Sequence, residues 1–208
     1  FPGAVLFSGP EASGKLTCAL ETARVLSCEG VERGHWECTC PSCVKHRQMV
    51  SNNILLLGPK NKSLEIFAAK KTLLTQSYQN SKHLEASRHL YIRAIRKLLA
   101  RYNPVLHEGN DNYSKVLSTI QSINETLELI DFSKTLPEGK ELENILNELD
   151  NLCEKLENSS VSDTITISQV RNLSSWAHFT NSSEKKIIIL ENVETMIEAS
   201  RNALLKIL

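Results

Sequence analysis

Apolar residues form two kinds of pattern along this chain: short continuous runs, and longer stretches with helical spacing. Three runs of four apolar residues stand next to turn or polar residues, at 4–7, 54–57 and 187–190. Runs of this length and composition are typical of buried strands in a parallel sheet. Helical spacing follows the first and the third run, so the pattern predicts an α/β fold with a parallel sheet and right-handed crossovers.

A different pattern fills the middle of the chain. From about residue 64 to residue 156 the apolar positions recur every three or four residues, which predicts helices. The last set has a heptad-like spacing: Leu142, Ile145, Leu149, Leu152 and Leu156. Pro104 and the stretch 137–139 interrupt these helices. We therefore expect a large helical insertion at 61–160, carried by an α/β domain formed from residues 1–60 and 161–208.

Charge is balanced over the whole chain and unevenly placed within the insertion. Lys and Arg number 24, as do Asp and Glu, so net charge indicates no general attraction to nucleic acid or membrane. Residues 82–101 carry six basic side chains and one acidic one, whereas 125–157 carry ten acidic and three basic ones. Two interpretations stay open: these helices pair with one another or are solvated, or the basic helix docks on phosphates or an acidic partner.

Composition and cysteine spacing indicate a globular protein with a metal site. Hydrophobic residues make up 41% of the chain, and no apolar run approaches the roughly 20 residues of a membrane helix, so we expect a cytoplasmic protein with no membrane partner. Four of the six cysteines crowd into one segment, which favours metal ligation in a reducing compartment over disulfides. Four thiolates suit a structural, tetrahedral Zn²⁺ site; free thiols, an empty site, or substitution of one thiol by His35 or His46 are the alternatives. The predicted ligands are Cys28, Cys38, Cys40 and Cys43.

The segment GPEASGKL at 9–16 matches the phosphate-loop pattern G-x-x-x-x-G-K at every fixed position except the last. Backbone amides of such a loop and the helix that follows bind nucleotide phosphates, and the lysine adds a positive charge; the alternative is a structural glycine-rich turn. The predicted nucleotide-binding residues are Gly9, Pro10, Glu11, Ala12, Ser13, Gly14, Lys15 and Leu16. In phosphate-loop NTPases the last position is Ser or Thr, which binds Mg²⁺, so Leu16 weakens the case for metal-dependent hydrolysis.

The third apolar run ends in Glu191 and Asn192, where a Walker B strand ends in Asp, with a Glu beside it in many ATPases. Asn192 has no ionisable group and cannot act as a general base. We expect a degenerate Walker B site, weak or absent binding of ATP or ADP, and no ATP hydrolysis by the chain alone. The alternative is that Glu191 holds a metal ion through water.

Together these motifs resemble a known family. The phosphate loop, the helix leading into the four-cysteine loop, and the segments ISQVRNL (167–173), KIIILEN (186–192) and NALLK (202–206) resemble the AAA+ module of bacterial DNA polymerase III clamp-loader subunits, the gamma/tau and delta-prime group. The resemblance covers approximately 1–60 and 164–208. In the family a short connection replaces the long helical segment between them.

The resemblance implies a P-loop NTPase fold of the AAA+ type and a role in DNA replication. Leu16, Glu191 and Asn192 make the chain more similar to delta-prime subunits, whose nucleotide motifs are often defective, than to gamma/tau subunits. The implied partners are the other clamp-loader subunits in a hetero-oligomeric ring, the sliding clamp, and primed DNA through the complex. An active ATPase of the gamma/tau type and a P-loop scaffold unrelated to replication remain the alternatives.

Overall fold

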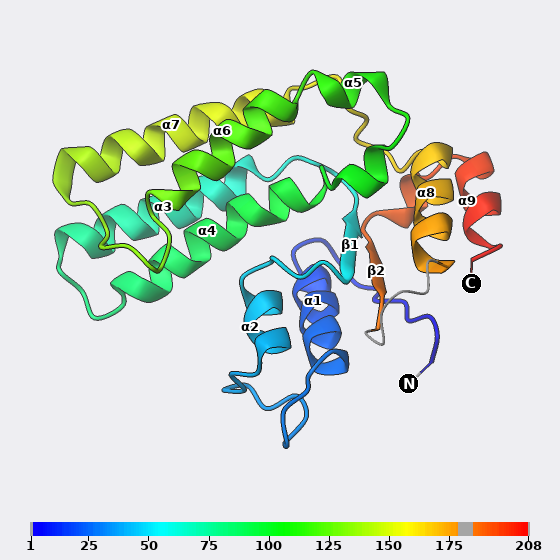
Figure 1. The fold of residues 1–208 in the computed structure, drawn as a ribbon, viewed down its shortest axis with the longest axis horizontal. Coiled ribbons are helices and arrows are strands. Elements are labelled where there is room, and N and C mark those ends of the chain that lie inside the picture. Colours follow the sequence, from blue (N-terminus) through cyan, green and yellow to red (C-terminus); the bar gives the residue numbers. More distant parts are fainter. Residues whose placement is uncertain (1, 179–184, 208) are drawn as a thin grey trace. The chain divides into compact units, whose positions relative to one another are not determined.

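The computed structural model describes residues 2–178 and 185–207, which form two compact units (Figure 1). Unit 1 comprises Phe1–Pro59, Ala100–Glu108 and Ser162–Leu208, and unit 2 comprises Lys60–Leu99 and Gly109–Val161. The elements of unit 1 are α1 (Lys15–Leu26), α2 (Pro41–Arg47), β1 (Ile54–Leu57), η1 (Pro104–His107), α8 (Ile167–His178), β2 (Ile187–Leu190), η2 (Val193–Thr195) and α9 (Glu198–Leu204). Those of unit 2 are α3 (Ser63–Tyr78), α4 (Leu84–Ala100, whose last residue belongs to unit 1), α5 (Asp111–Ser114), α6 (Leu117–Glu128) and α7 (Gly139–Glu157).

Unit 1 contains a small parallel sheet that is covered on both faces. Strands β1 and β2 pair in parallel, with Ile54 opposite Ile187 and Leu57 opposite Leu190, which confirms the two predicted strands and their direction. Alternate residues of β1 point to opposite faces. Leu55 and Leu57 pack with residues of α8, whereas Leu56 and Ile189 pack with residues of α1. Figure 1 shows the same arrangement, with α1 on one side of the strands and α8 and α9 on the other.

The prediction of a strand at 4–7 is wrong in this structure. The segment has no strand conformation, and Leu6 is 80% exposed. A four-residue apolar run becomes a strand only when a neighbouring strand takes up its backbone hydrogen bonds and a core covers its side chains. Among the described residues the sheet consists of β1 and β2 alone, so the run at 4–7 has neither.

Unit 2 consists of helices, as the spacing of its apolar residues predicts. The long helices α3, α4, α6 and α7 run beside one another (Figure 1). Of the heptad-like stripe on α7, Leu142, Ile145, Leu149 and Leu156 are buried and Leu152 is half-buried. The predicted helix breaks are also confirmed, because α4 ends before Pro104 and α7 begins at Gly139.

Much of the charge in unit 2 is paired inside the unit. Lys97 binds Glu65, Lys70 binds Asp150, and a guanidinium nitrogen of Arg96 lies 3.6 Å from a carboxylate oxygen of Asp131. Buried Arg88 donates to the carbonyl oxygens of Ile130 at 2.9 Å and Lys134 at 2.7 Å, in the turn that follows α6. Of these ion pairs, the one between Arg96 and Asp131 joins the basic segment 82–101 to the acidic segment 125–157, as the first of the two interpretations expects. Within the described ranges, no helix combines the length and the apolar character that a bilayer span requires.

Candidate metal centre and phosphate loop

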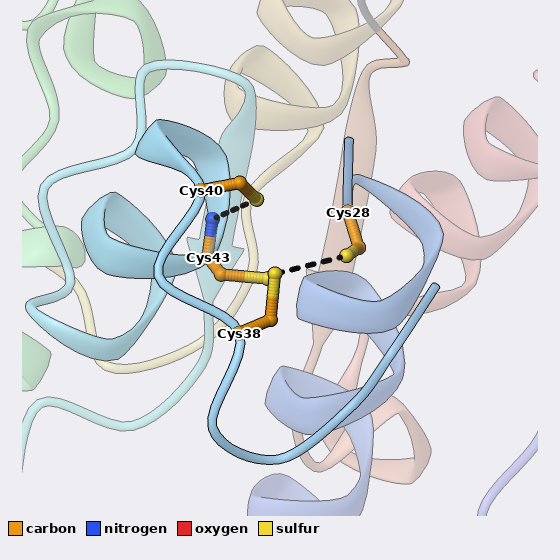
Figure 2. Close-up of side chains that lie close together, drawn as sticks. All are labelled: Cys28, Cys38, Cys40 and Cys43. Carbon is orange, nitrogen blue, oxygen red and sulfur yellow. Dashed lines mark hydrogen bonds between the residues drawn. The ribbon is translucent and has the colours of Figure 1, made fainter. Parts of the chain in front are cut away.

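The structure brings the four predicted metal ligands together. Cys28 follows the last turn of α1, Cys40 is the N-cap of α2, and Cys43 lies in the first turn of α2. Their sulfur atoms and that of Cys38 lie within 4.8 Å of one another, and the Cys28 and Cys38 sulfurs are 3.6 Å apart. Figure 2 shows the side chains turned toward one another. A tetrahedral zinc ion with Zn–S bonds of ~2.3 Å needs sulfurs about 3.8 Å apart, so the cluster has a suitable size.

Backbone groups line the cluster closely. The amide of Gly30 donates to the Cys28 sulfur, and the amide of Cys43 donates to the Cys40 sulfur, each at 3.4 Å. A Cβ at Gly30 would lie 2.7 Å from the Cys38 sulfur, a distance that side-chain carbons do not tolerate. A glycine at this position therefore lets the loop close over the sulfurs.

The surroundings also set the ionisation of the thiols. The backbone of Cys43 is the main hydrogen-bond donor to the Cys40 sulfur, and such backbone hydrogen bonds lower the pKa of Cys40 to about 6. Backbone hydrogen bonds from Gly34 and Gly30 lower the pKa of Cys28. Burial raises the pKa of Cys43, which is fully buried, to about 12. Because metal ions bind thiolates, a lowered pKa at Cys40 and Cys28 favours the form of the side chain that a metal ion binds. The four cysteines could hold a metal ion such as zinc.

The two histidines considered as substitute ligands lie outside this cluster. His35 is exposed, and its Nδ1 accepts a hydrogen bond from the backbone amide of Glu37. His46 is buried, and burial lowers its pKa. The structure thus groups the four cysteines without either imidazole.

A charged residue that the sequence reasoning missed lies against the cluster. Arg24, on α1, is buried and donates to the Cys43 sulfur at 3.0 Å and to the Gly34 carbonyl oxygen at 2.8 Å. It also forms an ion pair with Glu21, one helical turn earlier. The signal available in the sequence is an arginine next to Ala23 in the apolar face of α1, four residues before Cys28.

The predicted phosphate loop leads directly into α1. Gly14 is the N-cap of α1 with φ of 81°, and Ala12 also has a positive φ of 60°. In anion-binding loops, residues with positive φ between right-handed ones turn successive backbone amides toward one side. The amine of Lys15 folds back and donates to the carbonyl oxygens of Gly9 at 2.9 Å and Pro10 at 2.6 Å. Residues 9–13 are exposed.

Leu16 faces the core, in contrast to the hydroxyl side chain that phosphate-loop NTPases have at this position. It packs against the cluster formed by Leu20, Ala23, Leu56 and Ile189. Thr17, the next hydroxyl along the helix, is exposed. The first turn of α1 therefore contributes an apolar contact to the core where a magnesium ligand would stand.

Glu191, at the end of β2, is tied to a second arginine that the sequence reasoning did not single out. Its carboxylate forms an ion pair with Arg101, whose side chain is 3% exposed and whose Nε donates to the Pro59 carbonyl oxygen at 2.8 Å. Gly58 lies so close that a Cβ there would be 2.6 Å from the Cβ of Glu191. Asn192 is exposed and has a left-handed backbone with φ of 51°. Arg101 and Glu191 are 90 residues apart, and no local pattern links them.

Comparison with known proteins places most of the chain in a family and relates a short part of it to a plant protein. A family model described as "DNA polymerase III, delta subunit" matches residues 1–101 and 131–208. Protein STICHEL-like 3 of Arabidopsis thaliana is 43% identical over 54 residues, which is 26% of this chain and 5% of that protein. The chain thus spans a small part of this relative's length. No solved structure matches. The family match extends into the helical segment, beyond the part covered by the resemblance noted from the sequence.

Proposed function

Because the chain belongs to the DNA polymerase III, delta subunit family and is a clamp-loader-type subunit, we propose that it acts as a delta-prime-like member of the clamp loader. In this role it helps to place the sliding clamp on primed DNA during replication, within a ring of other clamp-loader subunits. The observation that carries the proposal is the family match at 1–101 and 131–208, which includes the phosphate loop, the cysteine cluster and β2.

The proposed subunit has a nucleotide pocket that does not support hydrolysis. Leu16 packs into the core, so the first turn of α1 offers no hydroxyl to Mg²⁺ at that position. Arg101 forms an ion pair with Oε2 of Glu191, so its positive charge stands at the carboxylate that would otherwise bind a metal ion. The retained half of the site, the loop backbone and Lys15, supports at most weak, magnesium-independent binding of ATP or ADP phosphates.

The proposed zinc ion has a structural role. Cys28, Cys38, Cys40 and Cys43 fill a tetrahedral coordination sphere and leave no open position for substrate or water. The segment from Ser27 to Cys40 contains neither helix nor strand. A metal cross-link between the end of α1 and the start of α2 would therefore stabilise this segment, which has no helix or strand of its own to do so.

The role in the clamp loader is tested by reconstitution. The chain is mixed with the remaining clamp-loader subunits and the sliding clamp, and complexes are separated by size-exclusion chromatography. We expect it to co-elute with the other subunits, and clamp loading on primed DNA to fall when it is left out. Assembly of the others without it, together with capture of an unrelated partner, would favour the scaffold alternative.

The nucleotide pocket is tested by calorimetry and by turnover. ATP is titrated with and without Mg²⁺ into the unmodified chain, into Lys15→Ala, and into Lys82→Ala, which changes an exposed lysine of unit 2. We expect weak or absent binding, no effect of magnesium and no release of phosphate. Magnesium-dependent turnover that disappears in Lys15→Ala and persists in Lys82→Ala would instead identify an active ATPase of the gamma/tau type.

A further inference from the structure

Every donor of the Arg24 side chain has a partner next to the cysteine cluster. An arginine has five N–H groups in a rigid planar fork. Nε donates to the Glu21 carboxylate at 2.9 Å, and one terminal nitrogen donates to Glu21 at 2.6 Å and to the Gly34 carbonyl oxygen at 2.8 Å. The other terminal nitrogen donates to the His35 carbonyl oxygen at 3.3 Å and to the Cys43 sulfur at 3.0 Å. One side chain thus connects α1, the loop and a ligand sulfur.

The charge of a four-thiolate zinc site explains why a cation is buried there. Zinc with four thiolates carries two net negative charges, and a buried charge is unfavourable unless other charges and hydrogen bonds compensate for it. The Arg24 side chain is 2% exposed, and a guanidinium keeps its proton throughout the pH range in which proteins are folded, so Arg24 brings a fixed positive charge to the cluster. Glu21 is itself 54% exposed, so water screens its charge more than that of the thiolates.

We propose that Arg24 is a positioning residue of the metal centre, which offsets part of the thiolate charge and holds Cys43 and the 34–35 backbone in ligand geometry. This rests on the proposed zinc site. Partners that hydrogen-bond to metal ligands orient them and tune metal affinity. Arginine suits the task better than lysine, because its fixed fork can reach a carboxylate, two carbonyls and a sulfur at once, whereas an ammonium is a compact point charge.

The test compares zinc affinity in Arg24→Gln and in a matched control, Arg33→Gln, which removes an exposed arginine from the same loop. Affinity is measured by competition with a chromophoric zinc chelator. We expect Arg24→Gln to weaken zinc binding roughly 10- to 100-fold and Arg33→Gln to leave it unchanged. Equal affinities for the two variants would overturn the inference. If the unmodified chain binds no zinc, the proposed metal centre itself fails, which is a distinguishable result.

A second readout separates this role from simple packing. In the Co²⁺-substituted chain, loss of the hydrogen bond to Cys43 makes that sulfur a better electron donor, so its charge-transfer band should move to lower energy in Arg24→Gln but not in Arg33→Gln. Arg24→Lys keeps a positive donor and should recover part of the zinc affinity. If Arg24→Gln does not fold, Arg24→Lys decides: an affinity and a cobalt spectrum identical to those of the unmodified chain would contradict the proposal.

Discussion

At the scale of single residues, two buried arginines have a common environment. Arg24 and Arg101 are nearly inaccessible to solvent, and each binds a carboxylate and at least one backbone carbonyl. Burying a guanidinium is unfavourable unless its donors are matched, so each arginine is stable only in the environment that the fold builds around it. Each also stands next to a predicted site: Arg24 at the cysteine cluster, and Arg101 at the end of β2.

The ion pair of Arg101 and Glu191 should be measurable in stability. Removing one member of a buried pair leaves the other charge uncompensated, so Arg101→Ala should lower the free energy of unfolding by about 3 kcal/mol. The double variant Arg101→Leu with Glu191→Leu leaves neither charge without its partner. Its free energy of unfolding should therefore fall less than that of either single leucine variant. Urea unfolding followed by circular dichroism measures these differences, with Arg171→Ala, at an exposed position of α8, as the control. A loss no larger than that of the control would show that the pair is not formed.

His107 gives unit 1 a dependence on pH. It is 3% exposed, its Nε2 donates to the Arg101 carbonyl oxygen at 2.7 Å, and burial lowers its pKa below the ordinary value of 6.5. Since the unfolded chain then binds this proton more tightly than the folded chain, the contribution of His107 to stability is complete above pH 6.5 and is lost as the pH falls below it.

The His107 effect is checked by comparing urea midpoints at pH 7.5 and pH 5. His107→Gln keeps a donor for the carbonyl and cannot be protonated, so its midpoint should fall less on acidification than that of the unmodified chain. His178→Gln, at the exposed end of α8, should behave like the unmodified chain. An identical pH response in all three proteins would mean that His107 does not titrate in this range.

At the scale of elements, the segment between α1 and β1 depends on the cysteine cluster. Metal analysis should find about one zinc per chain, and Cys28→Ser or Cys43→Ser should lower both zinc content and thermal stability, because each removes one of four ligands. Cys18→Ser is the matched control, since Cys18 is exposed on α1 and lies outside the cluster. A zinc-free chain with the same melting temperature as the serine variants would refute the site.

Most elements could be predicted from the sequence because their signals are local. The stripe on α7 and the helix after Gly14 follow from residues three and four apart, which meet on one face of a helix. The strand at 4–7 could not be judged in the same way, because a strand forms only beside a neighbouring strand. The run at 4–7 is apolar in either case, so its composition does not reveal whether a neighbouring strand is present.

The residues of the candidate site also differ in whether local sequence could predict them. The four cysteines could be predicted as a metal site because they lie close together in the sequence, and the fold places their sulfur atoms close together in space. The two arginines gave little or no signal: Arg24 meets Cys43 only because the loop folds back on α1, and Arg101 meets Glu191 across 90 residues. Contacts that close long loops depend on tertiary packing, and no periodicity in the sequence encodes them.

At the scale of the whole molecule, the chain leaves unit 1 at Pro59, returns for residues 100–108, and leaves again before its final return at residue 162. The short middle passage contributes directly to unit 1. Leu106 joins the core cluster with Leu55 and Val170, and Arg101 forms the ion pair with Glu191. The boundaries of 61 and 160 expected from the sequence place this passage inside the helical insertion, and nothing in the apolar spacing marks it as different.

The contribution of residues 100–108 can be tested with two deletions. One replaces 60–99 and 109–161 with short glycine-serine linkers and keeps 100–108; the other replaces 60–161 entirely. The first keeps the Leu106 contacts and the Arg101 ion pair, whereas the second exposes apolar surface around Leu55 and leaves Glu191 without its partner. We therefore expect the first product to be soluble, to unfold cooperatively in urea and to bind zinc, and the second to aggregate or to unfold at a lower urea concentration.

Equal stability of the two products would show that residues 100–108 belong functionally to the helical unit. Aggregation of both products would show that unit 1 requires unit 2 to fold.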